Sequence, residues 1–419
     1  MVELKMRKSA DAVTLMQQNF DISDVKVLYP QNIDWNKWFD YRPDVPFSDE
    51  VVDFLSALST SLLKDRESRL YPDVITFAFF CRKGNLLKLK SVYTDGGIGL
   101  GRGIVFHIAP SNVPINFGYS LVSGLLAGNY NVVRVSSKEF PQVDIIVRHI
   151  ATMGAEYQNV LNRIALVRYG HDSKANDYFS SICHVRVIWG GDATIAKLRQ
   201  SAIQPRAYDV TFSDRYSFAV VNADEMVKET NIQKIAEDFY NDTYLFDQNA
   251  CSAPHLVVWL GEDNNKLRAK EMFWTALHDE VTKKQYHFQP VMAVDKETAF
   301  YRQSQAMDIK RIQTDDNIMV RVKLNSLSKD IDDYRCKCGY FSEYDAGDIN
   351  EIVPIIKYKY QTMAVYGMSH DMLKSFVVDN RLIGIDRIVP FGETTAFSLT
   401  WDGYNLIHSL SRIILNAYN

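Results

Sequence analysis

Three short stretches carry residue types that could do chemistry together. Cys251 lies in "FDQNACSAP" (246–254), Asn112 in "APSNVP" (109–114), and Gly190 and Gly191 in "VIWGGD" (187–192). A loop thiol whose pKa is lowered becomes a thiolate nucleophile. A side-chain amide can donate a hydrogen bond to a developing oxyanion, and glycines at a strand–helix turn let a phosphate approach the backbone. Each of these residue types thus has a possible chemical role.

Each residue type also has a purely structural interpretation. Lone cysteines are often buried and inert, an asparagine beside proline often organises its own turn, and glycines at such junctions often serve the turn alone. Asp192, next to the glycine pair, places an anion beside the proposed anion site. Residue type alone therefore leaves the role of Cys251 open.

The elements around these residues predict a parallel sheet. A β-rich run at 103–109 leads through a turn into a helical pattern that Pro114 opens, and a second strand follows at 131–135. A second such unit runs from a strand at 184–189 through the glycine pair into a helix that Asp192 could cap. Two β–α–β units in about 100 residues predict a doubly wound α/β domain. Asn112 then follows the carboxyl end of a parallel strand, where ligands of such sheets bind.

The rest of the chain continues this alternation. The first 90 or so residues read as a helical and mixed preamble, with an amphipathic helix in "SDEVVDFLSALSTSLLKD" whose apolar face is Val52, Leu55, Leu58 and Leu62. After Ser213, strands such as "YSFAVV" and "HLVVWL" alternate with helices, and the end of the chain predicts a terminal helix.

Composition excludes several classes of protein. The 419 residues are 47% hydrophobic and 23% charged with a net charge of −4, which gives no electrostatic argument for a nucleic-acid partner. The apolar windows are too short for a membrane span, and the N-terminal residues do not resemble a secretory signal. Five cysteines in so long a chain fit reduced thiols in a cytoplasm. Cys336 and Cys338 in "RCKCG" lack a second pair at metal-binding spacing, so no metal site is expected.

The order and context of the motifs resemble the aldehyde dehydrogenase superfamily, and within it the LuxC-type acyl-CoA reductases. The matching segments are 107–138, 187–192, 246–254 and 386–412, so the resemblance covers roughly 100 to 412. It implies an α/β, aldehyde-dehydrogenase-like fold with a Rossmann-type cofactor domain and an α/β catalytic domain. We expect a preamble and NADP-binding domain over 1–245, a cysteine-bearing catalytic domain over 246–400, and a C-terminal helix over 401–419 that packs back on the body.

The resemblance also implies roles for single residues. Cys251 would be the nucleophile that takes the acyl group, and Asn112 would share an oxyanion hole with the Cys251 backbone N–H. The implied cofactor-binding residues are Gly190 and Gly191 at the pyrophosphate, and Ser136, Ser137 and Lys138 at the adenosine ribose. Neither His107 nor His255 is assigned as a base, because a histidine beside a strand is usually packed in a core.

Two departures from the superfamily pattern are informative. Thr211 stands roughly where hydrolytic members carry the glutamate that activates water, and the loss of that base suits a reductase. At the ribose site, Arg134 and Lys138 offer positive charge where NAD-preferring members hold a carboxylate, which favours NADPH.

The sequence thus predicts an NADPH-dependent reduction of an acyl thioester to an aldehyde through an acyl-cysteine. The donor would be acyl-CoA, or an acyl-carrier or acyl-synthetase partner, and the resemblance implies a homo-oligomer. One alternative is a cofactor-independent acyltransferase or thioesterase that uses Cys251, which would release free acid and leave NADPH fluorescence unchanged. The other is a non-catalytic relative of the family.

Overall fold

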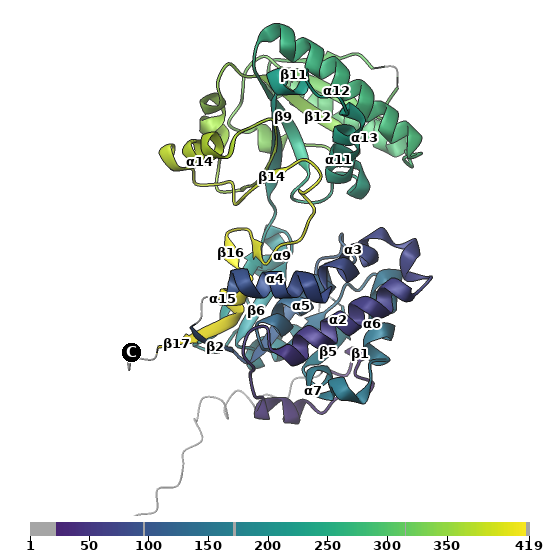
Figure 1. Ribbon diagram of the computed structural model, residues 1–419, viewed down its shortest axis with the longest axis vertical. Helices are drawn as coiled ribbons and strands as arrows, with labels where there is room; N and C mark the ends of the chain where they lie inside the picture. The colour runs from purple at the N-terminus through teal and green to yellow at the C-terminus, as the bar shows by residue number, and fades with distance from the viewer. Residues whose placement is uncertain (1–21, 95–96, 171–172, 315, 416–419) are drawn as a thin grey trace, which may run out of the picture. The chain divides into compact units, whose positions relative to one another are not determined.

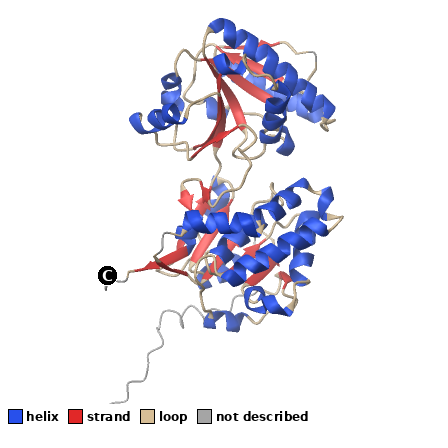
Figure 2. Cartoon of the chain, viewed as in Figure 1, coloured by secondary structure: helices blue, strands red, loops and turns tan. Residues whose placement is uncertain are grey.

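A computed structural model describes residues 22–94, 97–170, 173–314 and 316–415, and the chain divides into two compact units (Figure 1). The first unit contains the described residues up to Ser213 and those from Tyr404 onward, and the second is Asp214–Gly403. Both units combine helices with a sheet (Figure 2). No helix among the described residues is long and apolar enough to cross a membrane.

The first unit is built on a six-stranded sheet in the order β1-β5-β4-β3-β6-β7. The strands are β1 (Lys26–Tyr29), β3 (Ile104–Ile108), β4 (Tyr130–Arg134), β5 (Ile164–Arg168), β6 (Val185–Trp189) and β7 (Tyr208–Phe212). All pairs are parallel except β1 with β5. β3, β5 and β6 are buried along their whole length, as continuous apolar runs in a parallel sheet should be. The predicted strands and the doubly wound parallel sheet are confirmed.

Helices surround this sheet. They are α2 (Asp49–Lys64), α3 (Pro72–Phe80), α4 (Lys83–Tyr93), α5 (Asn116–Leu126), α6 (Pro141–Ala151), α7 (Gln158–Leu161), α8 (Ala175–Ile182), α9 (Asp192–Leu198) and α15 (Leu406–Leu410), with short 3-10 turns η1 (Trp35–Asp40), η2 (Ser68–Leu70) and η3 (Ala155–Tyr157). The apolar face predicted for α2 is buried. Gly128 follows the end of α5, and its φ of 86° and its approach to Asp44 O leave no room for a side chain.

The second unit is built on a seven-stranded sheet in the order β10-β11-β12-β9-β8-β13-β14. The strands are β8 (Tyr216–Asn222), β9 (Pro254–Leu260), β10 (Ile309–Ile312), β11 (Val320–Leu324), β12 (Tyr340–Asp345), β13 (Tyr360–Tyr366), β14 (Arg387–Pro390) and, outside this sheet, β15 (Thr400–Trp401). Apart from the antiparallel pair β10–β11, all neighbours are parallel.

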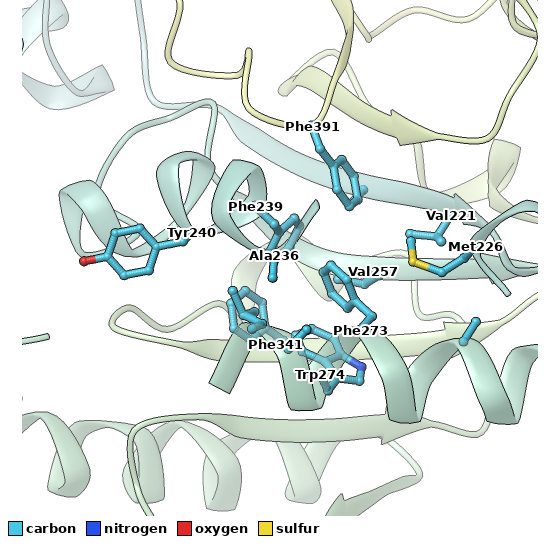
Figure 3. Close-up of a cluster of buried hydrophobic side chains, with 14 of the residues drawn as sticks. Val221, Met226, Ala236, Phe239, Tyr240, Val257, Phe273, Trp274, Phe341 and Phe391 are labelled. Atoms are coloured by element: carbon cyan, nitrogen blue, oxygen red, sulfur yellow. The ribbon is translucent and has the colours of Figure 1, made fainter. Parts of the chain in front are cut away.

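Two of the helices of this unit, at 232–242 and 263–283, pack on this sheet, and aromatic side chains fill the layer between these helices and the sheet. The helices of the unit are α10 (Ala223–Met226), α11 (Ile232–Asp242), α12 (Asp263–Lys283), α13 (Pro290–Ala306) and α14 (His370–Asp379), with 3-10 turns η4 (Tyr244–Phe246), η5 (Ile331–Asp333) and η6 (Ile349–Ile355). Phe239 of α11 meets Phe273 of α12 with ring centroids 5.1 Å apart, and both are fully buried (Figure 3). Each such edge-to-face pair adds about 0.5–1.5 kcal/mol to the burial of its rings. This core fixes α11 and therefore the loop that follows it.

The unit boundaries differ from the domain boundaries expected from the sequence. Residues 214–245 belong to the second unit, because β8 pairs with β9 on one side and β13 on the other. The expected helix over 401–419 is limited to α15 in the described residues. Ser411–Ile414 instead form β17, which pairs antiparallel with β2 (Ile98–Gly101), and β16 (Tyr404–Asn405) precedes α15. The β-branched pair Ile413–Ile414 favours a strand there.

Candidate active site

The first unit brings Asn112 and the predicted cofactor residues together at one edge of its sheet. Asn112 follows β3, Ser136 to Lys138 follow β4, and the glycine pair follows β6. Because β4, β3 and β6 are adjacent and parallel, their carboxyl ends meet at the same edge. This edge is where open α/β sheets bind ligands.

The glycine turn leaves open space above its backbone. Gly190 N donates to Phe212 O (3.1 Å), and Gly191 is the residue before α9. A side-chain carbon added at Gly191 would meet nothing within 4 Å. Asp192, expected as the cap, is instead the first helical residue and is exposed. The turn can therefore admit a ligand group close to its backbone.

The residues after β4 divide into buried and exposed. Ser136 is buried and its Oγ accepts a hydrogen bond from Lys138 N (3.1 Å), whereas Ser137 and Lys138 are exposed. Arg134 is 6% exposed: its Nη2 donates to Tyr169 O (3.2 Å) and its guanidinium lies 5.1 Å from the Tyr169 ring centre. Of the two cations predicted for a 2′-phosphate, Arg134 donates to Tyr169 while its Nε is buried with no hydrogen-bond partner among the described residues, and Lys138 is exposed.

Sequence reasoning missed a third cation at this edge. Arg168 ends β5, beside β4, and its Nε donates to Ser136 O (3.2 Å) while its Nη1 donates to Glu139 (3.2 Å). Its Nη2 is buried with no hydrogen-bond partner in the described part of the chain. A buried donor without a partner costs about 1–3 kcal/mol, so an anion bound there would satisfy it. The signal available in the sequence was an arginine at the last position of a parallel strand.

Asn112 lies exposed on the loop between β3 and α5, in the first unit. Cys251 lies in the second unit, so the two halves of the predicted oxyanion hole come from different units. The joint role of Asn112 and the Cys251 N–H stays a prediction.

Cys251 lies on the turn between η4 and β9, and the chain before it has an unusual backbone. Asp247 and Gln248 both have φ of 53°, in the left-handed region. The buried Gln248 holds this loop, since its Oε1 accepts from Gly339 N (2.7 Å) and Tyr340 N (3.1 Å) and its Nε2 donates to Pro254 O (3.0 Å). Cys251 is partly exposed at the end of this anchored loop.

The neighbours of Cys251 come from the amino ends of adjacent strands. Ser217, on β8, donates from its Oγ to Cys251 O (2.7 Å) and accepts there from Thr362 N (3.1 Å) of β13. Gln361, the residue before Thr362, donates from its Nε2 to the Cys251 Sγ (3.3 Å) and also to Asp402. These contacts fix both the backbone and the sulfur of Cys251.

The surroundings of this thiol oppose its ionisation. Burial and, after it, the nearby Asp402 carboxylate raise the pKa of Cys251 to about 11, even though the Gln361 hydrogen bond and Arg215 act to lower it. Burial also raises the pKa of Asp402, to about 6. The amide of Gln361 is thus the group in direct contact with the sulfur that favours the thiolate.

The two histidines near the motifs are packed in cores. His107 is fully buried in the first unit, with its ring nitrogens bonded to Ser120 Oγ (2.7 Å) and Asn131 Oδ1 (3.1 Å). His255 is buried in the second unit, where its Nδ1 faces Cys336 O (3.1 Å), and burial lowers its pKa to about 3. The described residues contain no group of three or more metal-ligating side chains.

Comparisons with known proteins agree with this architecture. The family model "Acyl-CoA reductase (LuxC)" matches residues 99–413. The long-chain acyl-protein thioester reductase of Vibrio harveyi is 22% identical over 309 residues, 71% of this chain and 60% of that protein. The one of Aliivibrio fischeri is 21% identical over 164 residues, 39% of this chain. The chain thus matches between 33% and 60% of the length of these curated relatives.

Solved structures show the same fold at low identity. A lactaldehyde dehydrogenase superposes with a TM-score of 0.62 at 10% identity, over 90% of this chain and 87% of the other. An NAD-dependent benzaldehyde dehydrogenase from Corynebacterium glutamicum gives a TM-score of 0.60 at 12% identity, over 90% and 86%. The predicted aldehyde-dehydrogenase-like α/β fold is confirmed. Since the family model covers well over half of its residues, the chain belongs to the acyl-CoA reductase (LuxC) family.

Proposed function

We propose that this protein reduces an acyl thioester to an aldehyde through a covalent acyl group on Cys251. The observation that carries the proposal is a partly exposed cysteine residue on an anchored loop, with its sulfur hydrogen-bonded by Gln361, in a chain of the acyl-CoA reductase family. The relatives' names specify acyl-protein thioesters, so the donor is acyl-CoA or an acyl group on a partner protein. Long-chain substrates and a synthetase partner belong to the same proposal.

The residues of the first unit fit an NADPH molecule. The open Gly191 turn suits the pyrophosphate, and the unpartnered Arg168 Nη2 with the exposed Lys138 suits a 2′-phosphate. The Glu139 carboxylate accepts a hydrogen bond from Arg168 Nη1, so a 2′-phosphate would share this guanidinium with Glu139. When bound, NADPH supplies the hydride that takes the thioester to the oxidation level of an aldehyde.

The chain's own residues act on the acyl group before and after that reduction. The Cys251 sulfur forms a bond to the thioester carbonyl carbon, and the bond from that carbon to the donor sulfur breaks, so the donor leaves as a thiolate. Asn112 and the Cys251 N–H would stabilise the oxyanion formed on the way. After reduction, the carbon–sulfur bond to Cys251 breaks, which releases aldehyde and returns the thiolate.

Intact-mass analysis tests this proposal. The protein is incubated with a panel of acyl-CoAs, with and without NADPH, and the adduct is mapped by peptide sequencing. Without NADPH, we expect an acyl adduct on Cys251. When NADPH is added, the adduct should disappear and aldehyde should form. Cys336→Ala removes another partly exposed cysteine of the same unit and should leave the adduct intact. Free acid formed without NADPH consumption would establish a thioesterase instead, and no adduct with any donor would contradict both.

A further inference from the structure

A buried glutamine connects the sulfur of Cys251 to a carboxylate. The Nε2 of Gln361 lies 3.3 Å from the Cys251 Sγ and also donates to Asp402 Oδ1. The side chain of Gln361 is fully buried, so water does not compete for these bonds. An amide nitrogen carries two hydrogens, one for each acceptor.

The hydrogen-bond network fixes which way this amide points. Thr362 Oγ1 donates to Gln361 Oε1 (3.3 Å), which assigns the oxygen to one side. A flipped amide would place that oxygen against the Asp402 carboxylate, where two acceptors repel. Asp402 therefore holds the nitrogen toward the sulfur.

Strand pairing and backbone conformation hold both residues in place. Gln361 lies on β13 between β8 and β14, and its carbonyl accepts from Asp386 N (2.8 Å). Asp402 has φ of 47°, a conformation that aspartate adopts more readily than most residues, and it directs the carboxylate to Gln361 from the turn after β15.

We propose that Gln361 is a positioning residue that stabilises the Cys251 thiolate through an N–H···S bond, with Asp402 orienting its amide. This rests on the proposed role of Cys251 as the nucleophile. The bond favours the free thiolate over the acyl thioester, because a thioester sulfur is a far weaker acceptor than a charged sulfur. Gln361 thus acts in the two steps where sulfur carries charge: the attack on the donor and the release of aldehyde.

The charged groups near the sulfur shift the pKa of Cys251 in opposite directions. Asp402 and Asp214 raise the pKa of Cys251, whereas Arg215 lowers it, and Arg215 is itself paired with Asp386. Arg387, on β14, is also near enough to interact with Cys251. The amide lies between two groups that are both anionic when Cys251 ionises, so it reduces their repulsion.

Alkylation of Cys251 by iodoacetamide at pH 8 tests the inference without substrate or cofactor. Gln361→Met keeps the volume and removes the donor, which should raise the thiol pKa by about one to two units. That change lowers the thiolate fraction at pH 8 about ten- to a hundredfold. Because a more basic thiolate is also more nucleophilic, part of this loss is offset, and the alkylation rate, followed on the Cys251 peptide, should fall about three- to tenfold. Asp402→Asn removes a negative charge and should raise the rate about threefold.

Gln303→Met is the matched control. Gln303 is also fully buried in the second unit and, like Gln361, bonds three side chains: Tyr340, Ser342 and the Met307 sulfur. Both variants should lower the temperature of unfolding, but Gln303→Met should leave the alkylation rate unchanged. If Gln361→Met fails to fold, Gln361→Glu decides, because its carboxylate beside the sulfur should slow alkylation more strongly.

Equal alkylation rates in wild type and the Gln361 variants would overturn the inference, as would a rate change of the same size in Gln303→Met. The result is separate from that of the acyl-CoA experiment. A protein that forms no acyl adduct and still shows slow alkylation in Gln361→Met would retain the inference and lose the proposed function. A protein that forms the acyl adduct, and whose Gln361→Met variant is alkylated at the wild-type rate, would retain the proposed function and lose the inference.

Discussion

The two units use opposite edges of similar sheets. In the first unit, Asn112 and the candidate cofactor residues lie at the carboxyl ends of β3, β4, β5 and β6. In the second unit, Cys251, Ser217 and Gln361 lie at the amino ends of β9, β8 and β13. At the carboxyl edge of the first sheet, β–α loops present backbone and glycine to a ligand, as open α/β sheets do. At the amino edge of the second, side chains of adjacent strands converge on one sulfur.

This difference shows which kind of site can be predicted from short stretches of sequence. A ligand site made by loops after strands depends on short stretches of sequence. A site made by the amino ends of strands depends on which strands are neighbours, and the sheet order sets that. The proposed division of labour follows: cofactor at one edge, acyl chemistry at the other.

Removal of the sulfur should give the largest effect and test this division directly. Cys251→Ala should abolish both the acyl adduct and aldehyde formation, because no other group takes the acyl chain. NADPH affinity, measured by fluorescence titration, should be unchanged, because the proposed binding residues all belong to the first unit. Full aldehyde formation in Cys251→Ala would show that Cys251 does not take the acyl group, and that the second unit does not carry the acyl chemistry through this residue.

Asn112 tests whether the first unit also contributes to the chemistry. Asn112→Ala should slow turnover on the order of 10²–10³-fold through loss of one oxyanion donor. The adduct should still form on Cys251, but slowly, in a stopped-flow or quenched mass measurement. Ser111→Ala, on the neighbouring exposed position, is the control and should turn over like wild type. A wild-type rate for Asn112→Ala would confine the chemistry to the second unit.

Arg168 tests the choice of cofactor at the first edge. Loss of a charge-assisted bond to the 2′-phosphate in Arg168→Met should weaken NADPH binding about ten- to a hundredfold and leave NADH binding nearly unchanged. Binding of 2′,5′-ADP against 5′-AMP, by calorimetry, measures this without turnover. Arg163→Met is the matched control, since Arg163 directly precedes β5, at its other end, and pairs there with Asp44 (2.9 Å). Equal weakening of both adenosine ligands would assign Arg168 a structural role.

The sequence sufficed for features that are local. Continuous apolar runs marked β3, β4, β6, β8 and β9, and the apolar face of α2 marked a helix, because burial leaves its period in the sequence. Family resemblance in the motifs of 107–138 and 246–254 indicated the fold, which solved structures confirm.

The contacts of Cys251 could not be predicted in this way. Gln361 is 110 residues from Cys251 in the chain, and it reaches the sulfur because β13 is the neighbour of β8, which pairs with β9. Sheet order and register decide that contact, and neither leaves a local pattern. The same is true of Arg168, which meets Ser136 because β5 pairs with β4. The sequence predicts residues 214–245 as part of the first domain, because the pairing of β8 with β9 and β13 leaves no local pattern.

The smallest effect concerns stability, and it contrasts one carboxyl group from each unit. Asp242, at the end of α11, is buried and accepts bonds from Gly392 N (2.7 Å), Thr394 N (3.0 Å) and Thr394 Oγ1 (2.8 Å). Burial outweighs these bonds and raises its pKa to about 7. Burial also acts on Asp65 of the first unit, but hydrogen bonds from Ser68, His149 and backbone N–H groups dominate and lower its pKa to about 2.

The two groups should therefore affect the temperature of unfolding in different pH windows. The folded protein holds the Asp242 proton more tightly than the unfolded chain, so this stabilisation is complete below about pH 4 and lost as pH rises toward 7. Asp242→Asn cannot titrate and should flatten the decline between pH 4 and 7, by a few degrees. The Asp65 contribution is present above about pH 4 and lost only as pH falls toward 2, so Asp65→Asn should leave the slope between pH 4 and 7 unchanged. Each substitution also removes hydrogen bonds, which shift the temperature of unfolding at every pH, so the slope with pH is the quantity that reports titration. An unchanged slope in Asp242→Asn would show that the loop at 392–394 is held by an ionised carboxylate.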